Sequence, residues 1–280
     1  VSTLTSPMVR KLGLVASLLI LLGSFGGGSL QKRNSLLSAA NLDFLSFGHG
    51  AAFSNVTLWL GTVLFVVAWV LMGKLVIDKV VGADYVRRTL CVWLVPLVGA
   101  APIMSRDVYS YLMQGTLLRD GLNAYTQGPA SNPNQILFEV SHDWRNTTTP
   151  YGPLHLWIGE AVTTIFGDNV TAGVYAFKVL AVAGFVAIMW FVPKIAQHLG
   201  ADPAFALWLG VANPVMVFHL VGGMHNEAMM VGLVTVGLYL VVRQVAYPAV
   251  LGGFFAGVAL IAVAMALKAS AALCLPFVVW

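Results

Sequence analysis

Long apolar stretches constrain the fold of this chain more than any other feature of its sequence. A membrane-spanning helix needs about 20 predominantly apolar residues to cross the hydrocarbon core. The stretches that approach or reach this length lie at residues 12–30, 56–73, 89–104, 170–192, 204–221, 228–242 and 245–267. They predict an all-α, polytopic bundle of transmembrane helices.

The composition excludes the soluble classes of protein. Apolar residues make up 59% of the chain and charged residues only 9%, whereas a soluble domain carries roughly 25% charged residues. The net charge of +4 is too small to indicate nucleic-acid binding. In a membrane protein, the placement of basic residues matters more than their sum.

The stretches divide the chain into three parts. We expect three N-terminal transmembrane helices in residues 1–104, a polar segment with interfacial helices in residues 105–169, and further transmembrane helices in residues 170–280. Residues 269–280 begin another apolar stretch, so we expect the protein to continue beyond Trp280 with further substrate-binding residues.

Basic residues predict the orientation, since they mark the cytoplasmic side. Arg10 and Lys11 precede the first stretch, and four more basic residues lie between the second and the third, at Lys74, Lys79, Arg87 and Arg88. Residues 105–153 are therefore expected outside, although Lys32 and Arg33 go against the trend. Residues 154–166 are short for a span. If they lie in the interface, residues 222–227 are also outside; if they span, that assignment inverts.

Local sequence signals predict a helix and a turn in the polar segment. Ser105 is a favourable N-cap for a helix over 106–120 that Gly121 closes. Its apolar residues Val108, Tyr111, Leu112 and Leu118 recur at helical spacing, which predicts a helix along the outer membrane surface. Asp107 falls in the first turn, where the helix dipole alone favours an acidic residue. Residues 147–153 form a Pro-rich turn.

Ionisable residues stand out in the second half of the chain. The sequence GGMHNE at 222–227 brings three polar side chains into one short connection, and Lys268 interrupts a long uncharged stretch. Charges inside such stretches usually serve function. A solvated turn and a snorkelling lysine are the structural alternatives. We expect Lys178 to snorkel, with contact to phosphate as the alternative. We expect His219 to be packed or hydrogen-bonded in the interior, and Asn213-Pro214 to kink the helix.

Four motifs carry a resemblance to a known family. They read SRDVYSYLMQGTLLRDGLNAY from Ser105, TPYGPL from Thr149, NP at Asn213 and GGMHNEAMM from Gly222. Together they resemble the actinobacterial α-(1→6)-mannopyranosyltransferases of lipomannan and lipoarabinomannan biosynthesis. The resemblance implies a glycosyltransferase of the GT-C fold. It would transfer mannose from polyprenyl-phosphate-mannose to a lipid-anchored α-(1→6)-mannan at the external face, with inversion.

The resemblance also implies roles for individual residues. It makes Asp107, at the start of the external segment, the catalytic base. Arg106 occupies the place of a second acidic residue found in some relatives, which implies a mechanism with no metal and no cofactor. Arg106 would contact the phosphate of the sugar donor or lipid headgroups.

The remaining candidates come from the chemistry of their side chains. His225 and Lys268 would stabilise the leaving phosphate. Glu227 and Asn226 would bind sugar hydroxyls, and Tyr151 and Trp144 would stack on sugar faces.

A secondary transporter or a flippase for lipid-linked sugars is the alternative class. Its pathway charges would be Lys268, Lys178 and Glu160. Inverted repeats are expected in such proteins, but residues 105–153 have no counterpart in the second half of the sequence. Within the enzyme class, a protein hydroxyl or another glycolipid stays open as the acceptor.

Overall fold

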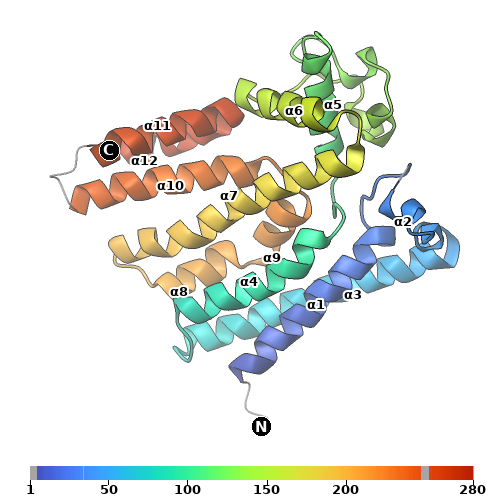
Figure 1. The fold of residues 1–280 in the computed structure, drawn as a ribbon. Coiled ribbons are helices and arrows are strands. Elements are labelled where there is room, and N and C mark those ends of the chain that lie inside the picture. The colour runs from blue at the N-terminus through green and yellow to red at the C-terminus, as the bar shows by residue number, and fades with distance from the viewer. Residues whose placement is uncertain (1–4, 34, 247–251, 280) are drawn as a thin grey trace. The chain divides into compact units, whose positions relative to one another are not determined.

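The computed structural model describes residues 5–33, 35–246 and 252–279, and all regular structure within them is helical (Figure 1). The predicted all-α class is confirmed. The chain forms two compact units. Unit 1 comprises Val1–Leu30, Asn34–Met104 and Ile188–Gly222, and unit 2 comprises Gln31–Arg33, Ser105–Ala187 and Gly223–Trp280. The expected division into residues 1–104, 105–169 and 170–280 stays a prediction.

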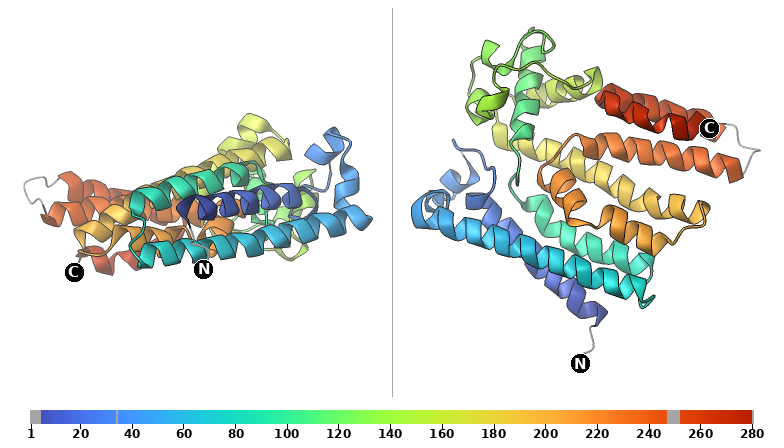
Figure 2. Two further views of the ribbon diagram at one scale, coloured as in Figure 1. Left: turned by 90° about the horizontal axis from the view of Figure 1, so that it is seen from below. Right: turned by 180° about the vertical axis from the view of Figure 1, so that it is seen from behind.

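Two long helices pack against each other in unit 1. Helix α1 (Ser6–Gly27) lies beside α3 (Gly48–Ile77), as both views of Figure 2 show. A Cβ atom on Gly23 would lie 2.4 Å from the Leu58 nitrogen, and one on Gly61 would lie 2.8 Å from the Ala16 oxygen. Small residues thus let the two backbones approach closely, as is common between helices in membranes.

Shorter helices complete the N-terminal part of unit 1. They are α2 (Leu36–Ala39), η1 (Asp43–Ser46) and α4 (Ala83–Gly99). Helix α4 corresponds to the predicted stretch 89–104, but it begins earlier and ends before Pro102.

The predicted kink at Asn213-Pro214 is confirmed. Helix α8 (Pro203–Ala206) continues into the π-helical η5 (Leu207–Val211), and α9 (Pro214–Met216) continues into the π-helical η6 (Val217–Gly222). The two halves meet at 53°. Proline cannot donate a hydrogen bond to the first half, and the Asn213 side chain accepts one from the Met216 nitrogen at 2.9 Å. His219 in η6 is exposed, so the expected interior position is wrong.

Unit 2 contains the predicted polar segment. Its helices are α5 (Asp107–Arg119), η2 (Pro129–Ser131), η3 (Ile136–Glu139), η4 (His142–Trp144) and α6 (Pro153–Phe166). Helix α7 (Val170–His198) passes from unit 2 into unit 1. The later elements are α10 (Glu227–Ala246), α11 (Gly252–Leu267), η7 (Ala269–Cys274) and α12 (Pro276–Val279).

Helices α10 and α11 lie side by side in Figures 1 and 2. The expected stretch 245–267 began too early, because α10 runs through Ala246. Residues 247–251 of that stretch lie outside the described residues. Gly237 and Gly257 face each other in this helix pair: a Cβ on either glycine would lie within 2.7 Å of the other's carbonyl oxygen.

Four described helices are long and apolar enough to cross a membrane, by length and composition: α1, α3, α7 and α10. The bent pair α8–η6 would make a fifth. Helix α6 has 14 residues, or about 21 Å at 1.5 Å per residue, whereas the hydrocarbon core is about 30 Å thick. Helix α6 is therefore shorter than a complete crossing requires, which favours the interfacial alternative for residues 154–166.

The predicted helix over 106–120 is confirmed as α5, but its N-cap is Arg106 and not the expected Ser105. The Ser105 hydroxyl still accepts a hydrogen bond from the Asp107 nitrogen at 3.1 Å. Its burial is not one-sided, because every residue from Val108 to Leu117 is buried. Two of the polar residues among them find partners: Thr116 donates to the Met113 carbonyl, and Gln114 accepts from Thr149. The buried Ser110 hydroxyl has no hydrogen-bond partner among the described residues. Helix α5 is thus the core of unit 2.

The crossing of α5 and α6 generates a stability prediction. A Cβ atom on Gly115 would lie 2.3 Å from the Gly159 carbonyl group, which is backbone and cannot rotate away. We expect Gly115→Ala to destabilise the protein by about 1–3 kcal/mol, seen as a lower midpoint of thermal unfolding in detergent. Gly210→Ala is the control, because a Cβ there meets nothing within 4 Å. Equal midpoints for the two variants would contradict this packing.

Candidate active site

Asp107 is the first residue of α5, and its carboxylate lines a small pocket in unit 2. The pocket is formed by Asp107, Ser110, Gln114, Trp144, Thr147, Thr148, Pro150 and Tyr151. The lining thus combines one carboxylate, hydroxyl and amide groups, and two aromatic rings. Such a combination suits a carbohydrate, whose hydroxyls form hydrogen bonds and whose apolar ring face packs on an aromatic side chain.

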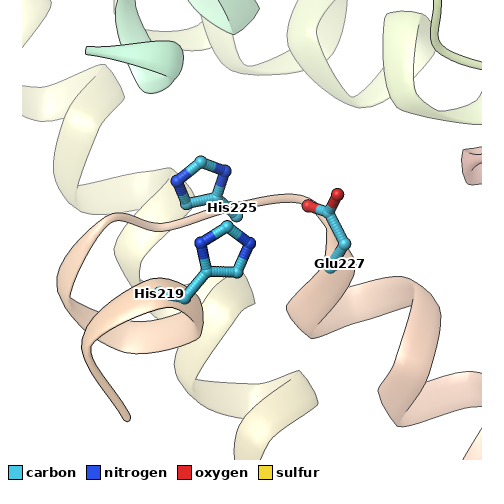
Figure 3. A group of neighbouring side chains, drawn as sticks. All are labelled: His219, His225 and Glu227. Atoms are coloured by element: carbon cyan, nitrogen blue, oxygen red, sulfur yellow. The ribbon is translucent and has the colours of Figure 1, made fainter. Parts of the chain in front are cut away.

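A histidine contacts the Asp107 carboxylate. The His225 Nδ1 lies 3.2 Å from the Asp107 Oδ2, and both side chains are largely shielded from solvent. His225 and Glu227 lie on the connection that leads into α10, where Figure 3 labels them. Met224, just before His225, has a φ of 55°. This left-handed conformation is unfavourable for a side chain of that size, so the connection is held in a strained shape at the site.

A second ion pair joins α10 to the end of α11. The Lys268 Nζ lies 2.5 Å from the Glu227 Oε1. Helix α11 ends at Leu267, and Lys268 has an extended backbone, so its side chain leaves the helix path. The ammonium also lies 5.5 Å from the centre of the Tyr151 ring, within the range of a cation–π interaction.

Tyr151 belongs to a buried aromatic cluster with Tyr111 and His155. The centre of the His155 ring lies 4.6 Å from that of each tyrosine. Burial raises the pKa of Tyr151 to about 12 and raises the pKa of Tyr111, so both phenols are neutral hydrogen-bond donors at pH 7. Burial also lowers the pKa of His155 to about 3. The cluster is therefore uncharged.

The turn that carries Tyr151 is fixed by backbone contacts. The Gly152 nitrogen donates to the Leu267 carbonyl at 2.9 Å, and Tyr125 donates its hydroxyl to the Tyr151 carbonyl at 3.1 Å. A Cβ on Gly152 would lie 2.2 Å from the Ala266 oxygen, which explains why glycine occupies this position. The turn predicted at 147–153 thus holds Tyr151 next to Lys268.

Asn226 is buried between His225 and Glu227. It is 1% exposed, and its side-chain oxygen and nitrogen have no hydrogen-bond partner among the described residues. The Glu227 Oε2 is in the same situation. A buried polar group left unsatisfied costs about 1–3 kcal/mol. Such groups at a site of paired charges are candidates for contact with a bound substrate.

Arg106 is engaged by an acidic residue that the sequence analysis missed. Its Nη2 donates to the Glu139 Oε2 at 2.7 Å, and its Nε donates to the Glu139 carbonyl at 2.9 Å. Glu139 is 1% exposed and also accepts hydrogen bonds from the backbone nitrogens of Lys32 and Arg33. The available signal was a single acidic residue in the apolar run 136–140.

Six of the candidates predicted from sequence meet in unit 2. Asp107 contacts His225, Glu227 contacts Lys268, Lys268 lies over Tyr151, and Asn226 donates its backbone N–H to the Tyr111 hydroxyl at 3.4 Å. Arg106 is adjacent in sequence but points to Glu139. Lys178 in α7 is completely buried, so the expectation that it snorkels to the surface is wrong.

Two possible metal ligands of unit 2, His225 and Glu227, have ligand atoms within 4.8 Å of each other. The Glu227 carboxylate is also paired with the ammonium group of Lys268. A cation bound to Glu227 would compete with Lys268 and repel it. A metal ion at Glu227 would therefore have to displace Lys268.

The fold and the site define a helical membrane protein with a candidate active site of paired ionisable groups beside a polar and aromatic pocket. The chain belongs to the family described as alpha-(1->6)-mannopyranosyltransferase, N-terminal domain, whose model matches residues 10–280. The family expected from the sequence motifs is confirmed.

Curated relatives carry the same description. Alpha-(1->6)-mannopyranosyltransferase A of Corynebacterium glutamicum is 57% identical over 270 residues, covering 94% of this chain and 54% of the relative. The protein of that name from Mycobacterium tuberculosis is 42% identical over 270 residues, covering 96% of this chain and 51% of the relative. Alpha-(1->6)-mannopyranosyltransferase B of C. glutamicum is 32% identical over 248 residues, covering 84% and 41%.

The chain thus spans about half the length of the curated relatives it matches. No solved structure gives a significant match.

The buried His155 generates a prediction about pH. Its pKa is about 3 in the folded protein, against 6.5 for a solvated histidine. Below about pH 6.5 the unfolded chain therefore binds a proton that the folded protein does not, and stability falls by at most about 1.4 kcal/mol per pH unit. We expect His155→Phe to lose less stability than the parent protein between pH 7.5 and pH 5.

Thermal unfolding in detergent at both pH values measures this difference. The exposed His142 provides the control, since His142→Phe should keep the parental pH dependence. An unchanged pH dependence in His155→Phe would contradict the neutral, buried state of this histidine.

Proposed function

We propose that the chain is the N-terminal part of a membrane mannosyltransferase. It would transfer mannose from polyprenyl-phosphate-mannose to a growing α-(1→6)-mannan glycolipid at the external face of the membrane. The family and the names of the relatives support mannosyl transfer. The observation that carries the proposal is the Asp107 carboxylate in a pocket with Trp144 and Tyr151, in the same unit as a lysine and a histidine.

The proposed reaction is a single displacement. The acceptor hydroxyl attacks the anomeric carbon of the mannosyl group, and the bond from that carbon to the phosphate oxygen breaks. Asp107 takes the proton of the attacking hydroxyl, and polyprenyl phosphate leaves with the electron pair. General base catalysis of this kind contributes roughly 10²–10⁴-fold. One displacement inverts the configuration, so a β-linked sugar donor gives an α-linkage.

Lys268 is the proposed ligand of the phosphate. Its Nζ has three hydrogen-bonding protons, of which Glu227 takes one at 2.5 Å. A phosphate that reaches Lys268 gains a charge-assisted hydrogen bond, and this bond strengthens as negative charge develops on the leaving group. His225 is not assigned to the phosphate in this proposal, because its Nδ1 contacts the Asp107 carboxylate. Arg106 contributes less in this proposal, because Glu139 already holds its guanidinium.

The sugar is proposed to lie against the aromatic rings. Trp144 is half exposed in the wall of the pocket, and Tyr151, which also lines the pocket, has its ring centre 5.5 Å from the Lys268 Nζ. Asn226 and the Glu227 Oε2 would bind sugar hydroxyls, which fits their lack of hydrogen-bond partners among the described residues.

The external location rests on the distribution of charge. Basic residues Arg87 and Arg88 precede the body of α4, and Lys194 lies near the end of α7. The positive-inside trend assigns these ends to the cytoplasm, which leaves residues 105–169 outside. Helix α6, too short to span, supports the same topology.

The experiment that tests the function uses membranes containing the full-length protein. They are incubated with radiolabelled polyprenyl-phosphate-mannose and a synthetic α-1,6-dimannoside. We expect a labelled trimannoside to form without GDP-mannose. Transfer only from GDP-mannose would contradict the proposed sugar donor, and no transfer to the dimannoside would contradict the proposed acceptor.

The first prediction for this reaction is that Asp107→Asn lowers kcat by roughly 10²-fold or more, with little change in KM for the sugar donor. Asparagine keeps the size of the side chain and an oxygen that accepts from His225, but it does not take a proton at neutral pH. The control is Asp143→Asn, which changes an exposed acidic residue of the same segment. Activity within a few-fold of the parent at equal protein levels would exclude Asp107 as the base.

The second prediction is that EDTA leaves transfer intact. Arg106 stands beside Asp107 where a second carboxylate would be needed for an acidic pair, and Glu227 is occupied by Lys268. Loss of activity that Mn²⁺ or Mg²⁺ restores would contradict the metal-free mechanism.

A further inference from the structure

The contact between His225 and Asp107 assigns a role to the histidine that its sequence context does not indicate. We propose that His225 is a positioning residue, which holds the Asp107 carboxylate in the orientation in which it receives the proton of the acceptor. This inference rests on the proposed function, since it concerns how the proposed base is held.

The distance between the two side chains lies within the range of a hydrogen bond. The His225 Nδ1 lies 3.2 Å from the Asp107 Oδ2. A neutral imidazole donates from only one of its ring nitrogens, and the nearby carboxylate selects the tautomer with the proton on Nδ1. A carboxylate can accept about four hydrogen bonds. An N–H at Oδ2 therefore leaves room for the attacking hydroxyl of the mannan substrate.

Helix α5 also contacts the backbone of the connection that carries His225. Tyr111 lies four residues after Asp107, and residues at this spacing share one face of a helix. The Tyr111 hydroxyl accepts the backbone N–H of Asn226, the residue after His225, at 3.4 Å. The same helix face thus contacts the connection twice, once at the His225 side chain and once at the backbone beside it.

Further contacts restrain the connection on its C-terminal side. The Ala228 nitrogen donates to the His225 carbonyl at 3.0 Å, and Glu227 is held by Lys268. The left-handed conformation of Met224 turns the chain immediately before the histidine. Such a backbone conformation persists only where its surroundings impose it. The connection is therefore built to present His225 in one position.

The alternative role for His225 is direct binding of the leaving phosphate, and the two roles differ in their kinetics. A positioning residue acts on the base, so its loss lowers kcat and leaves the affinity for the sugar donor almost unchanged. A phosphate ligand that also acts in the ground state raises KM for the sugar donor when it is removed. The two roles also differ in which replacement restores activity.

The test uses the full-length protein in membranes and compares His225→Asn with His225→Leu. The asparagine amide nitrogen can donate from close to the position of Nδ1, whereas leucine cannot donate. We expect His225→Leu to lower kcat by roughly 10- to 100-fold, as is typical of a misplaced catalytic group. His225→Asn should recover most of that loss, and KM for polyprenyl-phosphate-mannose should stay within about threefold in both. His49→Leu, at an exposed histidine of unit 1, should match the parent.

Three outcomes would overturn the inference. If His225→Asn and His225→Leu are equally impaired with a raised KM for the sugar donor, the histidine binds phosphate. If both variants keep parental kcat, the contact with Asp107 has no role in the reaction. An inactive parent protein would instead overturn the proposed function, and the inference would fall with it.

Discussion

The pairing of ionisable side chains away from bulk water is the constraint on which this candidate site depends. A charge removed from water is costly unless a partner compensates it. Unit 2 meets this requirement three times: Asp107 pairs with His225, Glu227 with Lys268, and Arg106 with Glu139. Each pair joins segments that are distant in the sequence, so the same contacts that stabilise the charges also assemble the site.

The paired residues also differ in the chemical roles that we propose for them. Asp107 lines a pocket with hydroxyl groups and aromatic rings, whereas the ammonium of Lys268 lies 5.5 Å from the centre of the Tyr151 ring and is paired with Glu227. The cluster of Tyr111, Tyr151 and His155 is neutral and buried. It supplies an uncharged support next to the proposed phosphate ligand. Pre-organised groups of this kind need little rearrangement during a reaction.

The sequence predicts the helices well where a strong local signal exists. The stretches behind α1, α3 and α7 are long and apolar, and Pro214 marks the bend of 53°. The sequence does not predict how α5 is enclosed, because the pattern of Val108, Tyr111 and Leu112 is compatible with burial on one face or on all. The polar side of α5 is also buried, and there Gln114 and Thr116 form hydrogen bonds within the protein.

Lys268 could be proposed as a site residue from sequence because a charged group is conspicuous in apolar surroundings, whereas Asp107 was proposed from the family resemblance. The pairing of the site residues could not be predicted from sequence, because contacts such as Asp107–His225 depend on how distant segments pack. Glu139 was missed for the same reason, since its partners Arg106, Lys32 and Arg33 come from two other segments. The burial of Lys178 also depends on tertiary packing and could not be predicted from its place in an apolar stretch.

The most direct test of this account is an electron cryomicroscopy structure of the full-length protein with a non-hydrolysable phosphonate analogue of polyprenyl-phosphate-mannose. The account predicts that a phosphonate oxygen lies about 2.7–3.2 Å from the Lys268 Nζ. It also predicts that the mannosyl ring lies in the pocket of Trp144 and Tyr151, with the Asp107 carboxylate on the face of the anomeric carbon opposite the phosphonate. An analogue bound where neither Lys268 nor Asp107 reaches it would contradict the central claim.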